Sequence, residues 1–107
     1  MASGILGQAV GTGSALIVYT VPATTLAVVN LSIVNNDGSN SETVVLRLVP
    51  SADSGSSTAK HNLENFSLPS NAVVERTGVV LGADDELELN ATSDVSISVW
   101  GIEESTS

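Results

Sequence analysis

The sequence predicts an all-β fold: a single antiparallel β-sandwich of about seven strands, jelly-roll-like or immunoglobulin-like, with an extended N-terminal arm. Three observations lead to this prediction. The chain has 107 residues, the length of one domain. From residue 14 onward, β-branched residues occur in short runs that are bounded by turn-forming residues. No segment repeats its apolar residues at the period of an amphipathic helix.

The first three predicted strands follow one another closely. Two of them, residues 16–21 and residues 43–49, are each followed by a proline. Proline ends a strand because it cannot donate a hydrogen bond to the strand ladder. Between these two strands, residues 26–34 change the parity of their apolar positions at Val28 and Val29. This change indicates a bulge or a strand that is buried on both faces.

The second half of the chain begins with the longest loop, residues 51–60, which is rich in Ser, Ala and Gly. The remaining predicted strands are residues 61–68, 73–81, 86–90 and 95–99. Gly78 predicts a kink, because glycine inside a strand often marks a bulge. Residues 86–90 alternate, which predicts leucines facing the core and acids facing solvent.

Glycine and small polar residues dominate the start of the chain. We divide the sequence into a flexible N-terminal arm (residues 1–13), the β-sandwich domain (residues 14–104) and a short tail (residues 105–107). The arm is expected to become ordered against a partner. Its candidate interface residues are Ile5, Leu6 and Val10.

The composition is poor in groups that perform chemistry. The net charge is −9, with three basic residues, one histidine and no cysteine. Thiol catalysis and Cys-based zinc sites are excluded, and nucleic-acid binding is not expected because it needs many Lys and Arg residues. The apolar run of residues 15–21 is too short to span a membrane. We therefore expect a soluble protein with no enzymatic activity, no cofactor and no membrane partner.

Candidate catalytic and metal-binding residues have simpler explanations. His61 is the one imidazole, and we expect it to be an exposed loop residue, since no nucleophile elbow accompanies it. Glu86 and Glu88 are paired carboxylates, predicted to lie on a solvated face. The segments 35–42 and 82–85 are rich in the oxygen ligands that Ca²⁺ prefers, but turn formation alone accounts for both. No metal site is predicted.

Only three aromatic residues are available for a sugar-binding platform: Tyr19, Phe66 and Trp100. Each lies in or beside a predicted strand, which favours the core or an interface. Trp100 is out of phase with Val95, Ile97 and Val99, so it is expected to point away from their face. Trp100 is therefore a fourth candidate interface residue.

Several motifs are specific enough to suggest a family. They are Y-T-V-P-A at residues 19–23, E-R-T-G-V-V-L at residues 75–81 and S-V-W-G-I-E-E at residues 98–104. With these motifs, residues 4–104 resemble a family of small β-sandwich virion proteins of tailed phages, especially phages of cyanobacteria and marine bacteria. The family often has C-N-R where residues 34–36 read V-N-N here, so any contact of that arginine is lost.

The resemblance implies a non-enzymatic structural role on the particle. The expected function is that of a capsid decoration (cement) protein, made in the host cytoplasm, that binds major capsid protein on the outer shell and stabilises it. Its expected state is a homo-oligomer, with a trimer favoured, because several simultaneous contacts raise affinity. The alternative is a tail, neck, baseplate or fibre module, which could bind a host receptor or glycan.

Overall fold

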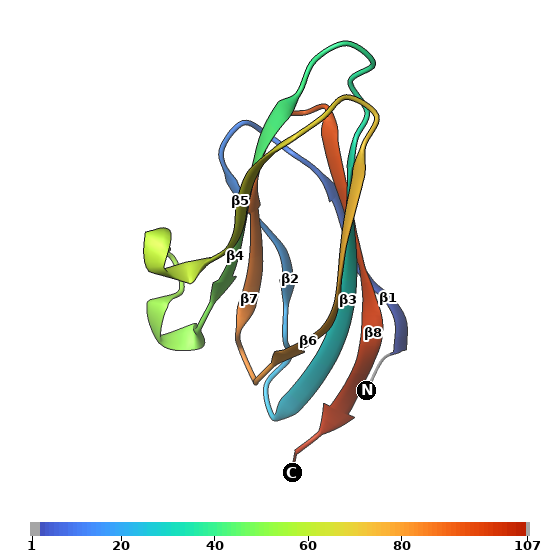
Figure 1. The fold of residues 1–107 in the computed structure, drawn as a ribbon. Coiled ribbons are helices and arrows are strands. Elements are labelled where there is room, and N and C mark those ends of the chain that lie inside the picture. The colour runs from blue at the N-terminus through green and yellow to red at the C-terminus, as the bar shows by residue number, and fades with distance from the viewer. Residues whose placement is uncertain (1–2, 107) are drawn as a thin grey trace.

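The computed structural model describes residues 3–106, which form eight strands in two antiparallel four-stranded sheets (Figure 1). The strands are β1 (Ser3–Val10), β2 (Ala15–Thr20), β3 (Thr25–Asn35), β4 (Glu42–Val49), β5 (Asn62–Leu68), β6 (Val73–Leu81), β7 (Glu86–Asn90) and β8 (Val95–Ser105). Two short 3₁₀ turns, Ser51–Asp53 and Ala59–His61, lie in the loop between β4 and β5. The predicted all-β sandwich is confirmed.

The strand order distinguishes the two predicted topologies. One sheet has the order β1-β8-β3-β6, and the other has the order β2-β7-β4-β5. Apart from β4 and β5, consecutive strands lie in opposite sheets, so the chain crosses between the layers at almost every turn. This is the order of an eight-stranded jelly roll, and not that of an immunoglobulin domain.

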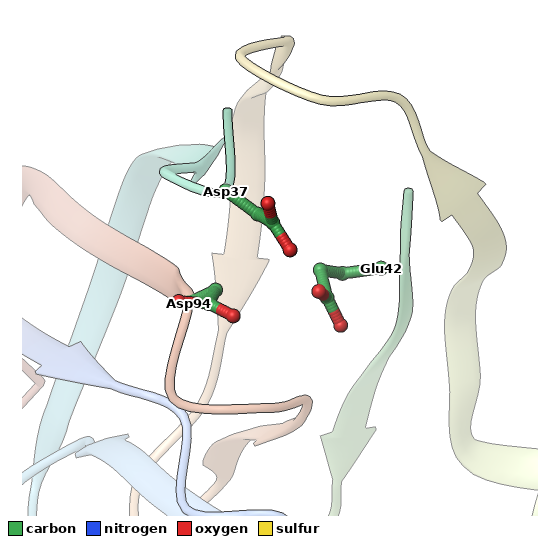
Figure 2. A group of neighbouring side chains, drawn as sticks. All are labelled: Asp37, Glu42 and Asp94. Atoms are coloured by element: carbon green, nitrogen blue, oxygen red, sulfur yellow. The ribbon is translucent and has the colours of Figure 1, made fainter. Parts of the chain in front are cut away.

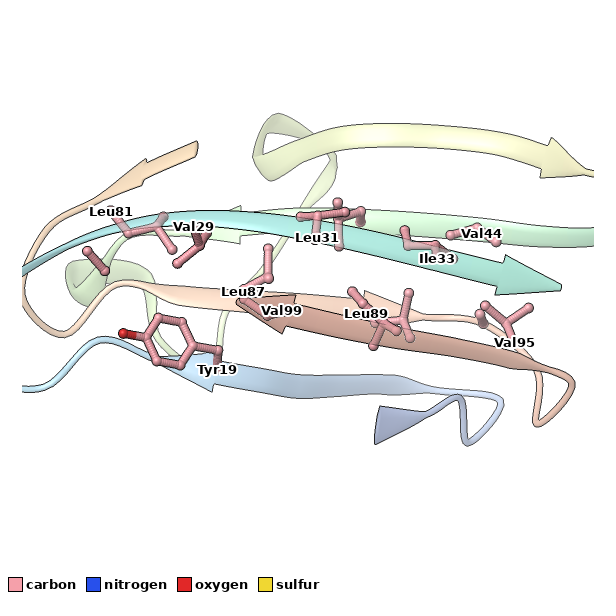
Figure 3. Close-up of a cluster of buried hydrophobic side chains, with 14 of the residues drawn as sticks. Tyr19, Val29, Leu31, Ile33, Val44, Leu81, Leu87, Leu89, Val95 and Val99 are labelled. Carbon is pink, nitrogen blue, oxygen red and sulfur yellow. The ribbon is translucent and has the colours of Figure 1, made fainter. Parts of the chain in front are cut away.

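The core is the aliphatic layer between the two sheets (Figure 3). Burial alternates strictly along β3, so the side chains on one of its faces fill this layer. The largest fully buried aliphatic side chains of this layer are Val21, Val29, Leu31, Ile33, Val44, Leu46, Leu87, Leu89, Val95, Ile97 and Val99. The predicted inward orientation of the leucines of β7 is confirmed.

The first residues of the chain differ from the prediction. Residues 3–10 are strand β1, an edge strand of the sandwich paired with β8 from Ser3↔Ile102 to Val10↔Ser96. The strand belongs to the fold because Leu6 and Ala9 pack against the core. The backbone N–H of Gly11 continues the attachment by donating to the carbonyl of Val95 at 2.8 Å. Residues 1–2 and 107, the outer ends of the predicted arm and tail, lie outside the described residues.

The kink predicted at Gly78 is confirmed. The pairing of β3 with β6 shifts register between Val29 and Leu31, and Gly78 has a φ of +69° at this irregularity. The amide of Gly78 bonds to the side chain of Asn30 instead of continuing the ladder. A bulge in β3, one of the two alternatives predicted for residues 26–34, is not found: β3 stays regular, and the irregularity lies in its partner strand β6.

Candidate interaction surface

The outer face of the β1-β8-β3-β6 sheet carries a group of apolar side chains. Trp100 and Ile102 alternate away from the core in β8, and the backbone register places Ile5 of β1 beside Trp100. On the other side of β8, Ile102 pairs with Val28, which also pairs with Val80 of β6. We call these residues, with Leu26, the apolar patch: Ile5, Leu26, Val28, Val80, Trp100 and Ile102.

Three residues of the apolar patch are open to solvent, while Leu26, Val28 and Trp100 are half-buried. Ile5 is 71% exposed, Val80 is 61% exposed and Ile102 is 50% exposed. The patch crosses all four strands of the sheet, so its residues form a contiguous surface. Contiguous exposed apolar surface of this kind is typical of an interaction site.

The same face is nearly free of charge. Four ionisable residues lie in the strands of this sheet: Glu75, Arg76, Glu103 and Glu104. Arg76 and Glu103 pair in register with the inward-facing Leu31 and Ala27. Glu75 and Glu104 face outward, the first beside Ser32 and the second beside Leu26, near opposite ends of β3. The other nine acids of this −9 chain lie outside the strands of this sheet.

The four predicted interface residues fall in three places. Ile5 and Trp100 are cross-strand neighbours in the apolar patch, and the predicted outward orientation of Trp100 is confirmed. Val10 is 52% exposed at the far end of β1. Leu6 instead packs against the core. To Ile5 and Trp100 the structure adds four patch residues that sequence reasoning missed: Leu26, Val28, Val80 and Ile102.

An acidic group lies at the end of the sandwich formed by the β3–β4 and β7–β8 connections (Figure 2). Carboxylate oxygens of Asp37, Glu42 and Asp94 lie within 4.8 Å of one another. Asp37 accepts hydrogen bonds from the amides of Ser39 and Asn40, which lower the pKa of its carboxyl. These are the bonds of a tight turn, as the sequence predicted for this segment.

The paired carboxylates of β7 differ from the prediction. Glu86 and Glu88 do face away from the core, but both are buried, with 7% exposure each. The loop of residues 51–61 covers them, because Ser54 donates to Glu86 at 2.7 Å and Ser57 donates to Glu88 at 2.7 Å. Among the described residues, Oε1 of Glu86 has no hydrogen-bond partner. Because the loop is hydrogen-bonded over both carboxylates, a substrate cannot reach them, and the arrangement does not favour glycosidase chemistry.

His61 is also buried, with 7% exposure, contrary to the prediction of an exposed loop residue. The amide of Thr58 donates to its Nδ1 atom at 2.9 Å, so Nε2 carries the proton that bonds to Asp53 at 3.0 Å. The pKa of Asp53 is lowered, first by this hydrogen bond and then by the charge of Lys60. Both ring nitrogens are thus used to fold the loop, which leaves none for a catalytic base.

The aromatic residues do not form a sugar-binding platform. Tyr19 is buried in the core, and Phe66 is partly buried against the core. A small cavity of about 150 Å³ is lined by Leu48, Val49, Pro50, Val80, Leu81 and Asp85. This volume is below the roughly 300–1,000 Å³ of ordinary ligand pockets.

The burial of Tyr19 gives a prediction for alkaline pH. Burial, together with the hydrogen bond to the Glu103 carboxylate and the charge of that group, raises the pKa of Tyr19 above its ordinary value of 10.0. Because the neutral phenol is favoured in the folded state, its stabilisation is present below pH 10 and is lost as the pH rises further. Tyr19 is the single tyrosine, so tyrosinate absorbance reports it alone. As the pH is raised, we expect this absorbance to appear together with unfolding, and to appear at a lower pH in the Glu103→Gln variant. Ionisation of Tyr19 near pH 10 while the protein stays folded would contradict the prediction.

No protein-family model matches the sequence, and a search of curated proteins finds no significant relative. Residues 3–106 contain no helix that is long and apolar enough to cross a membrane. The resemblance to virion proteins therefore stays a prediction.

Proposed function

We propose that this protein is a non-enzymatic structural component of a phage virion, a capsid decoration protein that binds the outer shell of major capsid protein and stabilises it. The observation that supports an assembly role is the apolar patch, which crosses the nearly uncharged outer face of one sheet in an otherwise acidic domain. Contiguous apolar surface on a protein's outside is typical of interaction sites, protein–protein contacts among them.

The rest of the described chain supports an assembly role. The imidazole and the two buried carboxylates of residues 3–106 are used in folding one loop. Jelly rolls serve as capsid and lectin domains among other uses, so the fold is compatible with a particle component but does not define it. The resemblance of three sequence motifs to those of small virion proteins is the reason for proposing that the assembly is a phage particle.

The test is the number of copies per particle, counted by quantitative mass spectrometry of purified virions that encode the chain. A decoration protein is expected in hundreds of copies and on purified heads that lack tails. A handful to dozens of copies, confined to the tail fraction, would contradict the proposal and favour a tail, neck, baseplate or fibre module. Absence from the particle would overturn both.

A further inference from the structure

We propose that the outer face of the β1-β8-β3-β6 sheet pairs two copies of this chain face to face. The proposal rests on the assembly role above and names the partner that occupies the apolar patch. It would leave the acidic surfaces of the pair free for the shell.

Charge favours a second copy over an unrelated partner. A foreign partner can carry basic residues, so it would be attracted to the acidic surfaces of this chain and not to this nearly uncharged face. A second copy also carries −9, so two copies repel one another across most of their surfaces. The outer face of this sheet offers them a contact with little repulsion, because Glu75 and Glu104 are its only outward-facing acids, the first beside Ser32 and the second beside Leu26.

The size of the face is sufficient for a stable contact. Four strands about 4.8 Å apart, with central strands of eleven residues rising about 3.3 Å each, give an area of roughly 650 Å². Two such faces in contact bury about 1,300 Å² in total, within the range of about 1,200–2,000 Å² for specific interfaces. The apolar patch alone is smaller, so the contact must also include the short Ser side chains of β8, Ser96 and Ser98.

The position of the patch suits a two-fold pair. Trp100 is at the middle of β8, and Val28 and Ile102 lie on the two central strands of the sheet. A two-fold axis through this region superposes one apolar patch on the other, as an isologous contact requires. Twisted sheets pack face to face in this way about 10 Å apart. A face-to-face contact is complete with two copies, so this arrangement predicts a dimer. From the sequence alone, the gain in affinity from multiple contacts favours a trimer instead.

The experiment is sedimentation velocity on the purified full chain over a dilution series. The wild type is expected to sediment at twice the chain mass of 10.9 kDa. Ile102→Glu places an extra negative charge on each face of the contact, so we expect dimerisation at least ~100-fold weaker. Val80→Glu does the same from edge strand β6, where Val80 is 61% exposed and folding tolerates the change.

The matched control is Leu63→Glu, which adds the same charge at a 37% exposed residue of β5 in the other sheet. It is expected to remain dimeric. A monomeric wild type, a trimer, or folded Ile102→Glu and Val80→Glu variants that stay dimeric would each overturn the proposal. The virion test is independent: a monomer present in hundreds of copies per head refutes only the pairing, and a dimer absent from heads refutes only the decoration role.

Discussion

Replacing Arg47 with methionine is expected to reduce the free energy of unfolding by about 3 kcal/mol, because it leaves a buried carboxylate without its cation. Arg47 lies on β4 beside Glu88 of β7, with Nη1 at 3.9 Å from the glutamate oxygen. Its guanidinium also donates to Asn62 at 2.8 Å and to Ser57 at 3.1 Å. The substitution thus loosens the loop of residues 51–61 as well as the ion pair.

Two further variants make this result specific. Arg76→Met removes the cation of the Arg76–Glu64 pair, whose arginine side chain is 44% exposed, so it is expected to cost no more than about 1 kcal/mol. The double variant Arg47→Met/Glu88→Leu removes both buried charges and is expected to recover part of the loss. Urea denaturation gives the three values. Equal losses for the two arginine variants would show that Glu88 does not depend on Arg47.

The parts of the fold that sequence predicted correctly are those set by neighbouring residues. Alternation along residues 86–90 places Leu87 and Leu89 in the core, and the phase of Val95 and Val99 places Trp100 on the outer face. A two-residue period determines the face of a strand directly, without knowledge of its partners.

The apolar patch had a signal in the sequence that was open to two interpretations. Val28 and Val29 are adjacent, so a regular strand must present one of them on each face. The change of parity predicted either a bulge or burial on both faces. The structure shows a regular strand with Val28 half-buried on the outer face of the sheet, and Val79 and Val80 in β6 repeat the pattern with Val80 exposed. Adjacent apolar residues in two paired strands are therefore a usable sign of a surface patch.

The features that were missed depend on segments distant in the sequence. Glu86 and Glu88 were predicted to face solvent, and their direction was right. A loop more than twenty residues earlier covers them, and alternation contains no information about that loop. The same loop buries His61. Strand β1 was missed because its glycines lower strand propensity, while its pairing partner β8 is at the other end of the chain.

A substitution at Gly11 tests whether the start of the chain is truly a strand of the sandwich. Gly11 is buried at the end of β1, and a Cβ there would lie 2.2 Å from the carbonyl oxygen of Thr92 and 2.5 Å from that of Ala91. Neither backbone oxygen can move without disturbing the β7–β8 turn. Gly11→Ala is therefore expected to destabilise the fold by about 3 kcal/mol.

Gly38→Ala is the matched control, because a Cβ at Gly38 meets no atom within 4 Å, and its expected effect is within about 0.5 kcal/mol of zero. Denaturation midpoints compare the two variants, and hydrogen exchange locates the effect. Displacement of residue 11 breaks its bond to the carbonyl of Val95, so amides of β1 should exchange faster than those of β4. Equal stability of the two alanine variants would mean that residues 3–11 do not pack on β8. That result would favour the sequence-based prediction that these residues form a flexible arm. It would also remove Ile5 from the apolar patch and reduce the area of the face that is proposed to join two copies.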